Sequence, residues 1–404
     1  MPQPPGRVPR TSIIVVSRHR PQHLARCLWA LSRQDHPCLE IVLVADPAAL
    51  DTCPELPLKR RAFDQANIAA ARNEGLALAA GEAVLFIDDD AIAAPGWARA
   101  LAEPLADPRV IAATGFTRGP DGLNWQVRAE RMTPSGRTLP LAIDRATLLA
   151  SENGNPVSTL GTNCGFCRAA LLEIGGFDAA FAYYLDESDV NMRLAARFPL
   201  ALTAVVPQAE VIHGMAPGAG RDSGGVPRDL AAIGRSAAIF AARHGGDPHG
   251  LREDQRKRLL RHMLAGRLDP LAVAPILATL ERGLAEGGCA VPPQPPAWDR
   301  PGPPDFRPMP AAAAAVPLFL AGWHWRAREL RRQAAQAVAE GRNVTLLLLS
   351  PGFWRHRLHL TPGGWWEQCG GLWGAAQADD PAAIFLSPTT RIARERRNLS
   401  LRGN

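Results

Sequence analysis

Short strand-like and helix-like segments alternate in the first ninety residues, and this alternation constrains the fold more than any other feature. Residues 11–17 (TSIIVVS), 40–46 (EIVLVAD) and 82–90 (EAVLFIDDD) are apolar runs typical of buried strands. Residues 21–34 and 65–81 have the apolar spacing of helices, and the glycine at the end of the second one is expected to terminate it. This order predicts a parallel sheet with right-handed crossover connections.

Polar residues stand at the ends of these predicted strands, namely Ser17, Asp46 and the run Asp88, Asp89 and Asp90. Because parallel sheets bind ligands beyond the carboxyl ends of their strands, we expect these residues to gather at one edge. Side chains alternate along an extended chain, so Asp88 and Asp90 point to one side and can hold a divalent cation such as Mg²⁺ or Mn²⁺. Asp89 points the other way and is expected to meet solvent. The alternative is a solvated acidic turn without metal.

Several familiar motifs are missing from the chain. Neither GxGxxG nor GxxxxGK[ST] follows the first strand, so metal and side chains would have to handle any phosphate groups. Cys164 and Cys167 form a lone CxxC without a second pair, which predicts packed or idle thiols in place of a zinc site. Seven scattered cysteines also argue against a disulfide framework.

Length and charge set further bounds. The 404 residues suffice for two domains, and no apolar stretch is long enough for a membrane span, since residues 311–325 are interrupted by Pro317. That stretch is expected to be buried or interfacial, and the N-terminus lacks a secretory signal, which predicts a cytoplasmic protein. Residues 1–213 carry a net charge of −3 and residues 214–404 a net charge of +9.

The basic excess of the second half has two interpretations. It forms either a solvated surface or a contact with an anionic partner, such as lipid headgroups on the inner face of a membrane or an acidic acceptor. No aromatic residues are interleaved with the basic ones in the manner of nucleic-acid-binding segments, so no nucleic acid is expected as a partner.

Six segments occur in an order that resembles the family 2 glycosyltransferases of the GT-A fold, and the resemblance covers roughly residues 11–245. They are TSIIVVSRHRPQHLARCLWALSRQ, EIVLVAD, ANIAAARNEGLALAAGEAVLFIDDDAIAAPGW, GTNCGFCRAALLEIGGFDAAF, YYLDESDVNMRL and PQAEVIHG. The resemblance implies an α/β fold, with a Rossmann-like, mostly parallel sheet flanked by helices. It also implies inverting, metal-dependent transfer of a sugar from a nucleoside-diphosphate sugar to the hydroxyl of a glycan or lipid-linked glycan, as in bacterial surface glycan synthesis.

The resemblance also assigns residues around the donor. Ser17 and Asp46 match positions that contact the nucleotide base, although a strand-end aspartate can simply cap a turn. Arg72 matches an arginine near the diphosphate, with an exposed helix arginine as the alternative. Asp90 matches a direct metal ligand, and Asp88 matches a ribose partner that can also reach the metal.

Further assignments concern the acceptor side and the histidine. Gly161, Thr162 and Asn163 resemble the turn that shapes the sugar and acceptor pocket, and a plain turn is the alternative. His213 matches a histidine that contacts the metal or diphosphate, although a lone histidine at a strand end is commonly structural. Asn73 is expected to support a loop.

The general base is expected among Asp186, Glu187 and Asp189, at the start of a predicted helix. Glu187 aligns best with the family's base, which takes the acceptor proton as the new bond forms. The alternatives are a helix N-terminus that stabilises acids without catalysis, and an ion pair of Asp189 with Arg193.

The rest of the chain is expected to be organised around a proline-rich segment. Helical patterns cover about 251–287 and 312–341, and strands with clustered tryptophans follow; Trp365 and Trp366 either stack on a sugar or pack against the main domain. Rival functions are a non-catalytic sugar-nucleotide-binding scaffold and a nucleotidyltransferase. The expected segments are an arm (1–10), the transferase domain (11–245), a helical extension (246–288), a linker (289–310) and a C-terminal α+β region (311–404).

Overall fold

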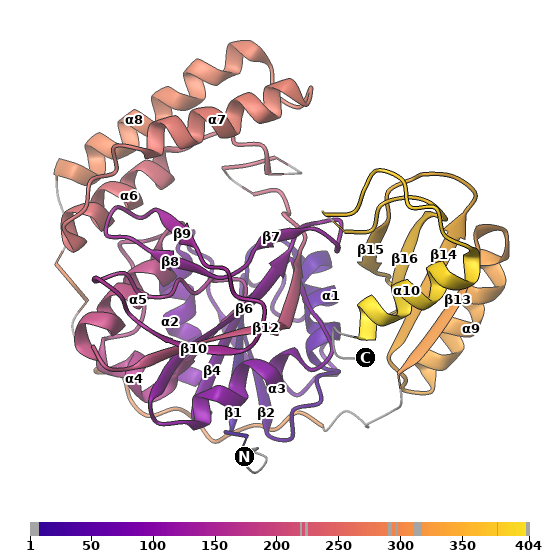
Figure 1. Cartoon of the computed structure of the whole chain (residues 1–404). Helices are drawn as coiled ribbons and strands as arrows, with labels where there is room; N and C mark the ends of the chain where they lie inside the picture. Colours follow the sequence, from indigo (N-terminus) through magenta and orange to yellow (C-terminus); the bar gives the residue numbers. More distant parts are fainter. Residues whose placement is uncertain are drawn as a thin grey trace.

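The computed structural model describes residues 8–218, 220–222, 225–289, 293–295, 297–310, 317–377 and 379–400. Figure 1 shows a large sheet flanked by helices, a helical unit above it and a smaller α/β unit beside it. The predicted α/β class is confirmed, including a C-terminal region with helices and a small sheet. The first seven residues of the expected N-terminal arm lie outside the described ranges.

The first half of the main sheet forms as predicted from the apolar runs. Four parallel strands, in the order β4-β1-β2-β3, are joined through two helices. The elements are β1 (Thr11–Ser17), α1 (Pro21–Leu31), β2 (Leu39–Ala45), β3 (Lys59–Ala62), α2 (Ile68–Leu78) and β4 (Ala83–Asp88). Gly81 does not end α2, because the chain is already extended at Ala79. Gly81 instead allows close approach to β1, since a Cβ there would lie 2.6 Å from the amide nitrogen of Ser12.

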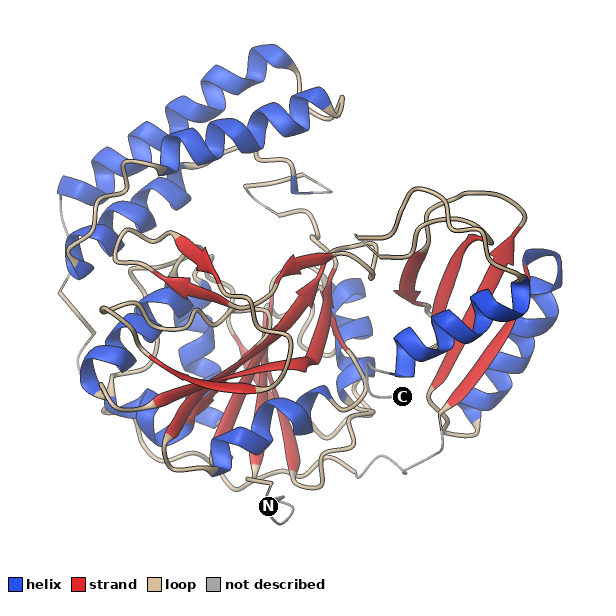
Figure 2. Cartoon of the chain, in the orientation of Figure 1, coloured by secondary structure: helices blue, strands red, loops and turns tan. Residues whose placement is uncertain are grey.

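The second half of the sheet contains antiparallel strands that periodicity did not predict. β11 (Cys164–Cys167) lies between β4 and β6 and is antiparallel to both. The other strands here are β5 (Ala91–Ala93), β6 (Val110–Arg118), β7 (Trp125–Val127), β10 (Thr147–Ala150) and β12 (Leu202–His213), and β8 (Glu130–Met132) pairs with β9 (Thr138–Pro140) in a separate ribbon. The full order is β10-β12-β6-β11-β4-β1-β2-β3, with β5 on β12 and β7 on β6 (Figure 2).

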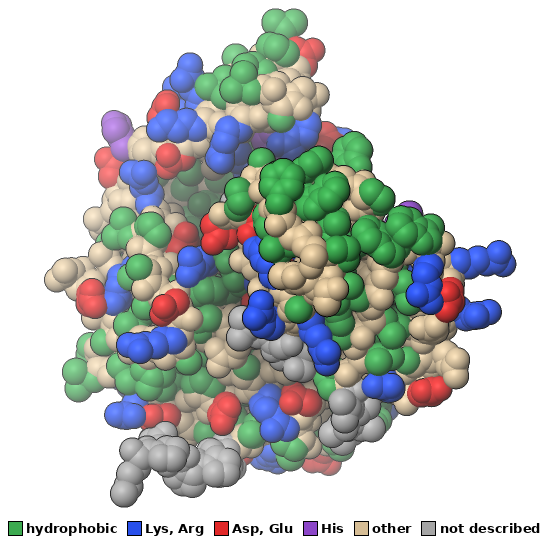
Figure 3. Space-filling view, turned by 45° about the vertical axis from the view of Figure 1, so that its right-hand side comes forward, with side chains coloured by type: hydrophobic (Ala, Val, Ile, Leu, Met, Phe, Trp, Pro, Cys, Tyr) green, Lys and Arg blue, Asp and Glu red, His purple; other side chains and the backbone are tan. Residues whose placement is uncertain are grey.

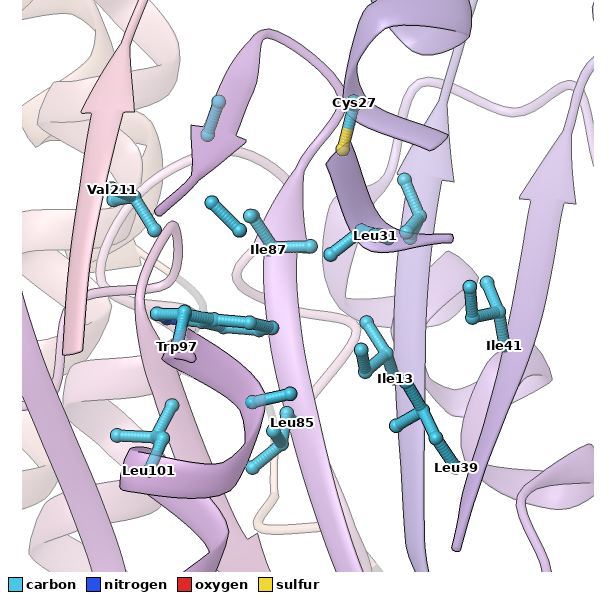
Figure 4. Packing of buried hydrophobic residues seen from close by; sticks show 14 of the residues in the cluster. Ile13, Cys27, Leu31, Leu39, Ile41, Leu85, Ile87, Trp97, Leu101 and Val211 are labelled. Atoms are coloured by element: carbon cyan, nitrogen blue, oxygen red, sulfur yellow. The ribbon is translucent and has the colours of Figure 1, made fainter. Parts of the chain in front are cut away.

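Hydrophobic cores cover both faces of the main sheet. On one face α1 and α3 (Trp97–Ala102) pack on the strands, and Figure 4 shows Leu31 and Trp97 gathered with Ile13, Leu85 and Ile87. On the other face lie α2, α4 (Arg168–Glu173) and α5 (Asp186–Arg197). Successive residues of β1 enter opposite cores, as the two-residue period of a strand requires. Both cysteines of the CxxC are free thiols at this second face, so the prediction of packed thiols is confirmed.

A helical unit follows the sheet. It consists of α6 (Ala231–His244), α7 (Leu251–Leu264) and α8 (Val273–Cys289). Glycines allow α6 and α8 to approach closely, since a Cβ at Gly283 would lie 2.0 Å from the carbonyl oxygen of Ala231. Helix α6 shares a core with α7 and α8, so this unit begins before residue 246. Within the described ranges, every helix is too short or too polar for a membrane span.

Residues 297–310 of the proline-rich segment run along the amino edge of the main sheet. The amide of Met309 donates to the carbonyl of Leu39 over 2.7 Å, and Lys59 donates to the carbonyl of Pro304 over 3.2 Å. Trp298 packs against the core on the α2 side. This segment is therefore bound to the main domain along its length.

The C-terminal region is a four-stranded sheet with a helix on each side. Its elements are β13 (Leu318–Trp323), α9 (Ala327–Ala339), β14 (Val344–Ser350), β15 (Arg357–Leu360), β16 (Trp366–Gly371) and α10 (Pro388–Ser400). The order is β13-β14-β16-β15, and only β15 is antiparallel to its neighbour. The predicted helix over 312–341 is wrong for β13, because an apolar run without periodicity does not distinguish a strand from a buried helix. The stretch 311–325 is described only from residue 317, and β13 is half-buried.

The C-terminal unit contacts the main domain through both of its adjacent tryptophans. Trp366 packs in a cluster with Leu123 of the β6–β7 loop, and Trp29 of α1 packs against the same buried residues of α9 and β14 as Trp365. The amide of Leu358 also donates to the carbonyl of Asp121 over 2.8 Å. Packing against the main domain, one of the two expectations for these tryptophans, is confirmed.

Candidate active site

Acidic residues at the carboxyl end of β4 meet a histidine from the end of β12. Asp88, Asp90 and His213 each offer one ligand atom, and these atoms all lie within 4.8 Å of one another. The contact depends on β5, which follows the aspartates and pairs with β12 so that Ala91 lies opposite His213. As predicted, Asp88 and Asp90 therefore share one side.

The contacts around this cluster can be compared with what a cation site requires. His213 Nδ1 lies 3.2 Å from Gln126 Oε1, while its Nε2 lies 3.4 Å from Asp90 Oδ1. That Nε2 is buried and has no hydrogen-bond partner in the described part of the chain. Two carboxylates and an imidazole, oriented by a further side chain, fit a divalent cation and leave positions for phosphate oxygens.

Asp90 is held in its ionised form. Burial alone would raise the pKa of Asp90, but His213, the amide of Ala216 and the guanidinium of Arg20 outweigh it and keep the pKa below its usual range. The Ala216 amide donates to Asp90 Oδ2 over 2.7 Å. Ionised carboxylates are the form that binds cations.

The expectation that Asp89 meets solvent is wrong. Its side chain is fully buried, and its Oδ2 accepts a hydrogen bond from the Ser17 hydroxyl over 2.6 Å. Arg20 Nη2 lies 2.9 Å from the other oxygen. Burial raises the pKa of Asp89 to about 7, against the opposing effects of Arg20 and Ser17. The middle aspartate thus ties the ends of β1 and β4 together.

Ser17 and Asp46 are both buried and bonded within the protein. Asp46 caps the turn after β2, since it accepts from the amides of His19 at 2.7 Å, Ala48 at 3.1 Å and Ala49 at 3.3 Å. Burial opposes this effect, but these amides and the His19 side chain lower the pKa of Asp46. The turn alternative for Asp46 is therefore present in the structure, and contact with a nucleotide base stays a prediction.

Arg72 is the central cation of the site. It is buried on α2, which refutes the alternative of an exposed helix arginine. Its guanidinium lies 2.5 Å from Asp186, 3.3 Å from Asp88 and 3.7 Å from Glu187. It also donates to the carbonyl of Gly161 over 3.0 Å. The planar guanidinium of Arg72 thereby links β4, the 161–163 turn and the start of α5.

The three acids of the first turn of α5 have different surroundings. Asp189 is fully buried between Arg193, at 2.7 Å, and His244, at 3.0 Å, so the predicted helical ion pair is present. Asp186 is bound by Arg72 as described. Glu187 keeps 17% of its side chain exposed. Burial, followed by the neighbouring Asp186 carboxylate, raises the pKa of Glu187 well above its usual range.

The residues of the turn at 161–163 differ in whether their side chains are bonded within the protein. Asn163 is fully buried, and its amide accepts from the Trp97 indole and donates to the carbonyls of Phe116 and Ala209. Thr162 is also buried, but its hydroxyl has no hydrogen-bond partner among the described residues. The expected role of Asn73 is confirmed, because its amide bonds both backbone groups of Phe177.

Three residues beside the aspartates were not predicted. Arg20 and Arg221 each lie 3.7 Å from Asp90 Oδ2, and Gln126 orients His213. The basic stretch after β1, where a dinucleotide-binding protein carries glycines, was a signal for Arg20. Nothing in the sequence marks Gln126, which reaches the site through the pairing of β7 with β6.

Comparison with known proteins identifies the first part of the main domain. Residues 12–175 match the family model described as Glycosyl transferase family 2. The match places the similarity to glycosyltransferase family 2 in this segment of the chain. The resemblance is thus confirmed for the family 2 segment, which includes Asp88 and Asp90. Glu187 and His213 lie beyond its end.

Two relatives share short parts of this segment. The glucosyl-dolichyl phosphate glucuronosyltransferase of Haloferax volcanii is 32% identical over 112 residues, which cover 28% of this chain and 34% of that protein. The N-acetylglucosaminyl-diphospho-decaprenol L-rhamnosyltransferase of Mycobacterium tuberculosis is 38% identical over 93 residues, which cover 22% and 29% of the two chains. The chain therefore spans about a third of the length of these relatives.

Solved structures overlap with a larger part of the chain at lower similarity. The Pyrobaculum calidifontis mannosyltransferase PcManGT, in complex with GDP-Man and Mn²⁺, has a TM-score of 0.40 and 21% identity, and the alignment covers 70% of this chain and 74% of that one. The S. aureus protein TarS has a TM-score of 0.39 and 19% identity, with 63% and 43% covered. Likenesses at this level decide neither the donor nor the metal.

Proposed function

We propose that this protein is an inverting glycosyltransferase that moves one sugar from a nucleoside-diphosphate sugar to an acceptor hydroxyl. The observation that carries the proposal is the cluster of Asp88, Asp90 and His213 at the carboxyl edge of a sheet whose first strands belong to family 2. The acceptor is a glycan or lipid-linked glycan of bacterial surface synthesis, and the names of the two relatives support the lipid-linked class.

Asp88, Asp90 and His213 would hold the divalent cation, Mg²⁺ or Mn²⁺. A bound cation supplies charge neutralisation for the departing nucleoside diphosphate. Arg20 and Arg221 add positive charge beside Asp90, on the side where phosphate oxygens would approach. These side chains take the place of the glycine-rich phosphate loop that the chain lacks.

Glu187 is the general base in this proposal. The other two acids are already committed, since Asp186 is bound by Arg72 and Asp189 by Arg193 and His244. Of the three acids, Glu187 alone is partly exposed, so its carboxylate is the one that an acceptor hydroxyl can reach. It takes the proton from the acceptor hydroxyl at its carboxylate oxygen while the hydroxyl oxygen attacks the anomeric carbon from the face opposite the leaving group.

The remaining predicted contacts are part of the same proposal. Ser17 and Asp46 border the nucleotide base, Arg72 stands near the diphosphate, and the 161–163 turn borders the sugar. Of that turn, the Thr162 hydroxyl is buried and has no hydrogen-bond partner among the described residues, whereas the Asn163 amide is already bonded within the protein. We further propose that the transferase domain, expected at residues 11–245, is followed by a helical extension that reaches residue 288 and already includes α6, by a linker at 289–310 and by an accessory region at 311–404.

The test is the thermal stability of the protein with UDP, GDP or dTDP, with and without Mn²⁺. A nucleotide at a hundred times its dissociation constant should add about 2.7 kcal/mol of stability. We expect one nucleotide to stabilise only with metal, and Asp90→Asn to abolish this effect. Asp144→Asn, an exposed acid on the loop before β10, is the matched control. No stabilisation under any condition would contradict the proposal.

Turnover separates the rival functions. A transferase releases the nucleoside diphosphate from its sugar donor when an acceptor is present, whereas a scaffold binds the donor without consuming it. A nucleotidyltransferase would instead consume a nucleoside triphosphate and release pyrophosphate. Detection of pyrophosphate, or metal-dependent binding without any turnover of a sugar donor, would replace the proposed function with one of these.

A further inference from the structure

Aromatic side chains follow the carboxyl ends of all three parallel strands of the C-terminal sheet. Trp323 ends β13 and stacks on Trp325, with ring centroids 4.8 Å apart. Phe353, which follows β14, contacts Trp373, which follows β16, at 5.3 Å and Phe385 at 6.0 Å. We call these residues the aromatic edge: Trp323, Trp325, Phe353, Trp354, Trp373 and Phe385.

Much of the aromatic edge is open to solvent. Trp354 is 76% exposed and Phe385 is 77% exposed, although the sheet beneath them has its own buried core of leucines. Figure 3 shows hydrophobic side chains gathered on the upper part of this face of the molecule. Soluble monomers rarely expose contiguous apolar patches of this kind unless the patch contacts another surface. Packing within the domain therefore does not account for these side chains.

A second apolar projection lies on the helical unit. Leu264, the last residue of α7, and Leu271, between α7 and α8, are 81% and 84% exposed, and we call them the hairpin tip. In Figure 1 the turn between α7 and α8 and the carboxyl ends of both sheets lie toward the top of the view. Two separate apolar projections thus lie on the side where the acceptor must approach the acids. An extended surface can touch both at once, whereas a small glycan cannot.

The positive charge around these projections favours an anionic partner surface. Residues 317–404 contain twelve arginines and no lysine against six acids, and α7 is also rich in arginine. Figure 3 shows basic side chains bordering the hydrophobic patch. Aromatic residues suit the headgroup region of a bilayer, leucines suit its acyl boundary, and arginines are attracted to anionic headgroups. Leucine offers no stacking face to a sugar, which disfavours a glycan as the common partner.

We propose that the aromatic edge and the hairpin tip together dock this protein on an anionic lipid surface, with the carboxyl edge of the main sheet facing the lipid. The inference rests on the proposed function in one respect, which is that the acceptor is expected to meet the enzyme at this lipid surface. Lipid binding itself needs neither donor nor turnover, so the two proposals can fail independently.

Sedimentation of the full chain with vesicles tests the docking surface. We expect binding to phosphatidylcholine vesicles that contain phosphatidylglycerol, weaker binding to phosphatidylcholine alone, and release as salt is raised. The pair Trp354→Ala and Phe385→Ala should lower the partition coefficient roughly tenfold or more. Leu200→Ala is the matched control, because Leu200 is 91% exposed but lies before β12, at the opposite edge of the sheet.

A second pair of substitutions tests the hairpin tip separately. Leu264→Ser with Leu271→Ser should also weaken vesicle binding, and transfer to a water-soluble acceptor should persist in both double variants. Failure of the wild type to bind vesicles, or equal binding by all variants, would overturn the inference. So would release from vesicles by a soluble oligosaccharide, or a concentration-dependent dimer that the aromatic pair abolishes, since these outcomes assign the surface to a glycan or a second copy.

Discussion

The two sheets of this protein have similar topology at their carboxyl edges but opposite chemistry. In the main sheet the strand ends carry Asp46 and Asp88, beside His213 at the end of β12. In the C-terminal sheet the corresponding ends carry Trp323, and Phe353 just beyond β14. Parallel strands fix where side chains gather, and the residues at the strand ends fix what the edge can bind. The shared topology therefore says nothing of the function of either edge.

The interiors differ as well. The main sheet has a charge cluster around Arg72 at its carboxyl edge, whereas the C-terminal sheet buries a polar network between its strands and α10. There the Arg391 guanidinium lies 2.9 Å from His356 Nε2 and 3.0 Å from Glu395. Gln368 donates to Glu395 over 2.8 Å and contacts the other nitrogen of His356. This network holds the helix on the sheet, and no residue of it is exposed enough to meet a substrate.

The largest effect, on the rate of transfer, is expected from Glu187→Gln at the carboxyl edge of the main sheet. Removing the base should lower the rate of transfer about 100- to 10,000-fold while donor binding is retained, because the amide cannot accept the acceptor proton. Steady-state kinetics together with nucleotide-dependent thermal stability measure both quantities. Glu103→Gln, an exposed acid outside the site, is the control. Full activity of Glu187→Gln would exclude Glu187 as the base. The proposed difference between a catalytic edge on the main sheet and a non-catalytic edge on the C-terminal sheet would then lose its main support.

The next effect concerns the buried network of the C-terminal sheet. Arg391→Met leaves Glu395 buried without its partner and should destabilise this unit by about 3–5 kcal/mol. Hydrogen exchange of β14 and β16 should then increase while the main sheet stays protected. Arg328→Met, an exposed position on α9, should change neither. Unchanged exchange in Arg391→Met would mean that apolar packing alone holds α10 in place.

Acid should weaken both sheets, each through one buried histidine. Burial and then Arg99 lower the pKa of His36 to about 4, and burial and then Arg391 lower the pKa of His356. A lowered pKa contributes stability above the unfolded-state value near 6.5, and this stability is lost as pH falls toward the folded-state value. At pH 5 the loss from His36 should be about 2 kcal/mol relative to pH 7.5. Urea unfolding at the two pH values measures it.

The substitution His36→Gln serves as the check. His36 lies at the amino edge of the main sheet, where its Nδ1 accepts from the Cys38 amide over 3.2 Å and its Nε2 lies 3.0 Å from the Thr11 hydroxyl. Glutamine can keep one of these bonds but does not titrate. The main sheet of the variant should therefore lose less stability between pH 7.5 and 5 than the wild type. An equal loss would place the acid sensitivity elsewhere.

The parts of the fold that periodicity governs were predictable from the sequence. Strands β1, β2 and β4 and helix α1 lie where apolar spacing places them, because a local repeat is enough to define an element and its buried face. The alternation of side chains also placed Asp88 and Asp90 on one side. The order of the strands could be inferred only in part, since the parallel half follows from crossovers but the antiparallel half does not.

The parts that depend on distant pairing were not predictable. β11 is four residues long and is defined by its neighbours β4 and β6, so its own sequence carries little signal. Gln126 reaches His213 through β7, and Asp89 is buried because Arg20 and Ser17 reach it from β1 and the loop after it. Each contact joins segments that are remote in sequence, and no local pattern records it.

The smallest effect is expected at the aromatic edge, and its small size is informative. Trp354→Ala with Phe385→Ala should change the free energy of unfolding by no more than about 0.5 kcal/mol per substitution, because both side chains are mostly exposed. Leu347→Ala, at a fully buried position of β14, should cost about 2–5 kcal/mol. Urea unfolding measures the free energy of unfolding for all three substitutions. If the aromatic pair were as costly as Leu347, these rings would belong to the core of their domain, and the contrast between a catalytic edge and a docking edge would lose its basis.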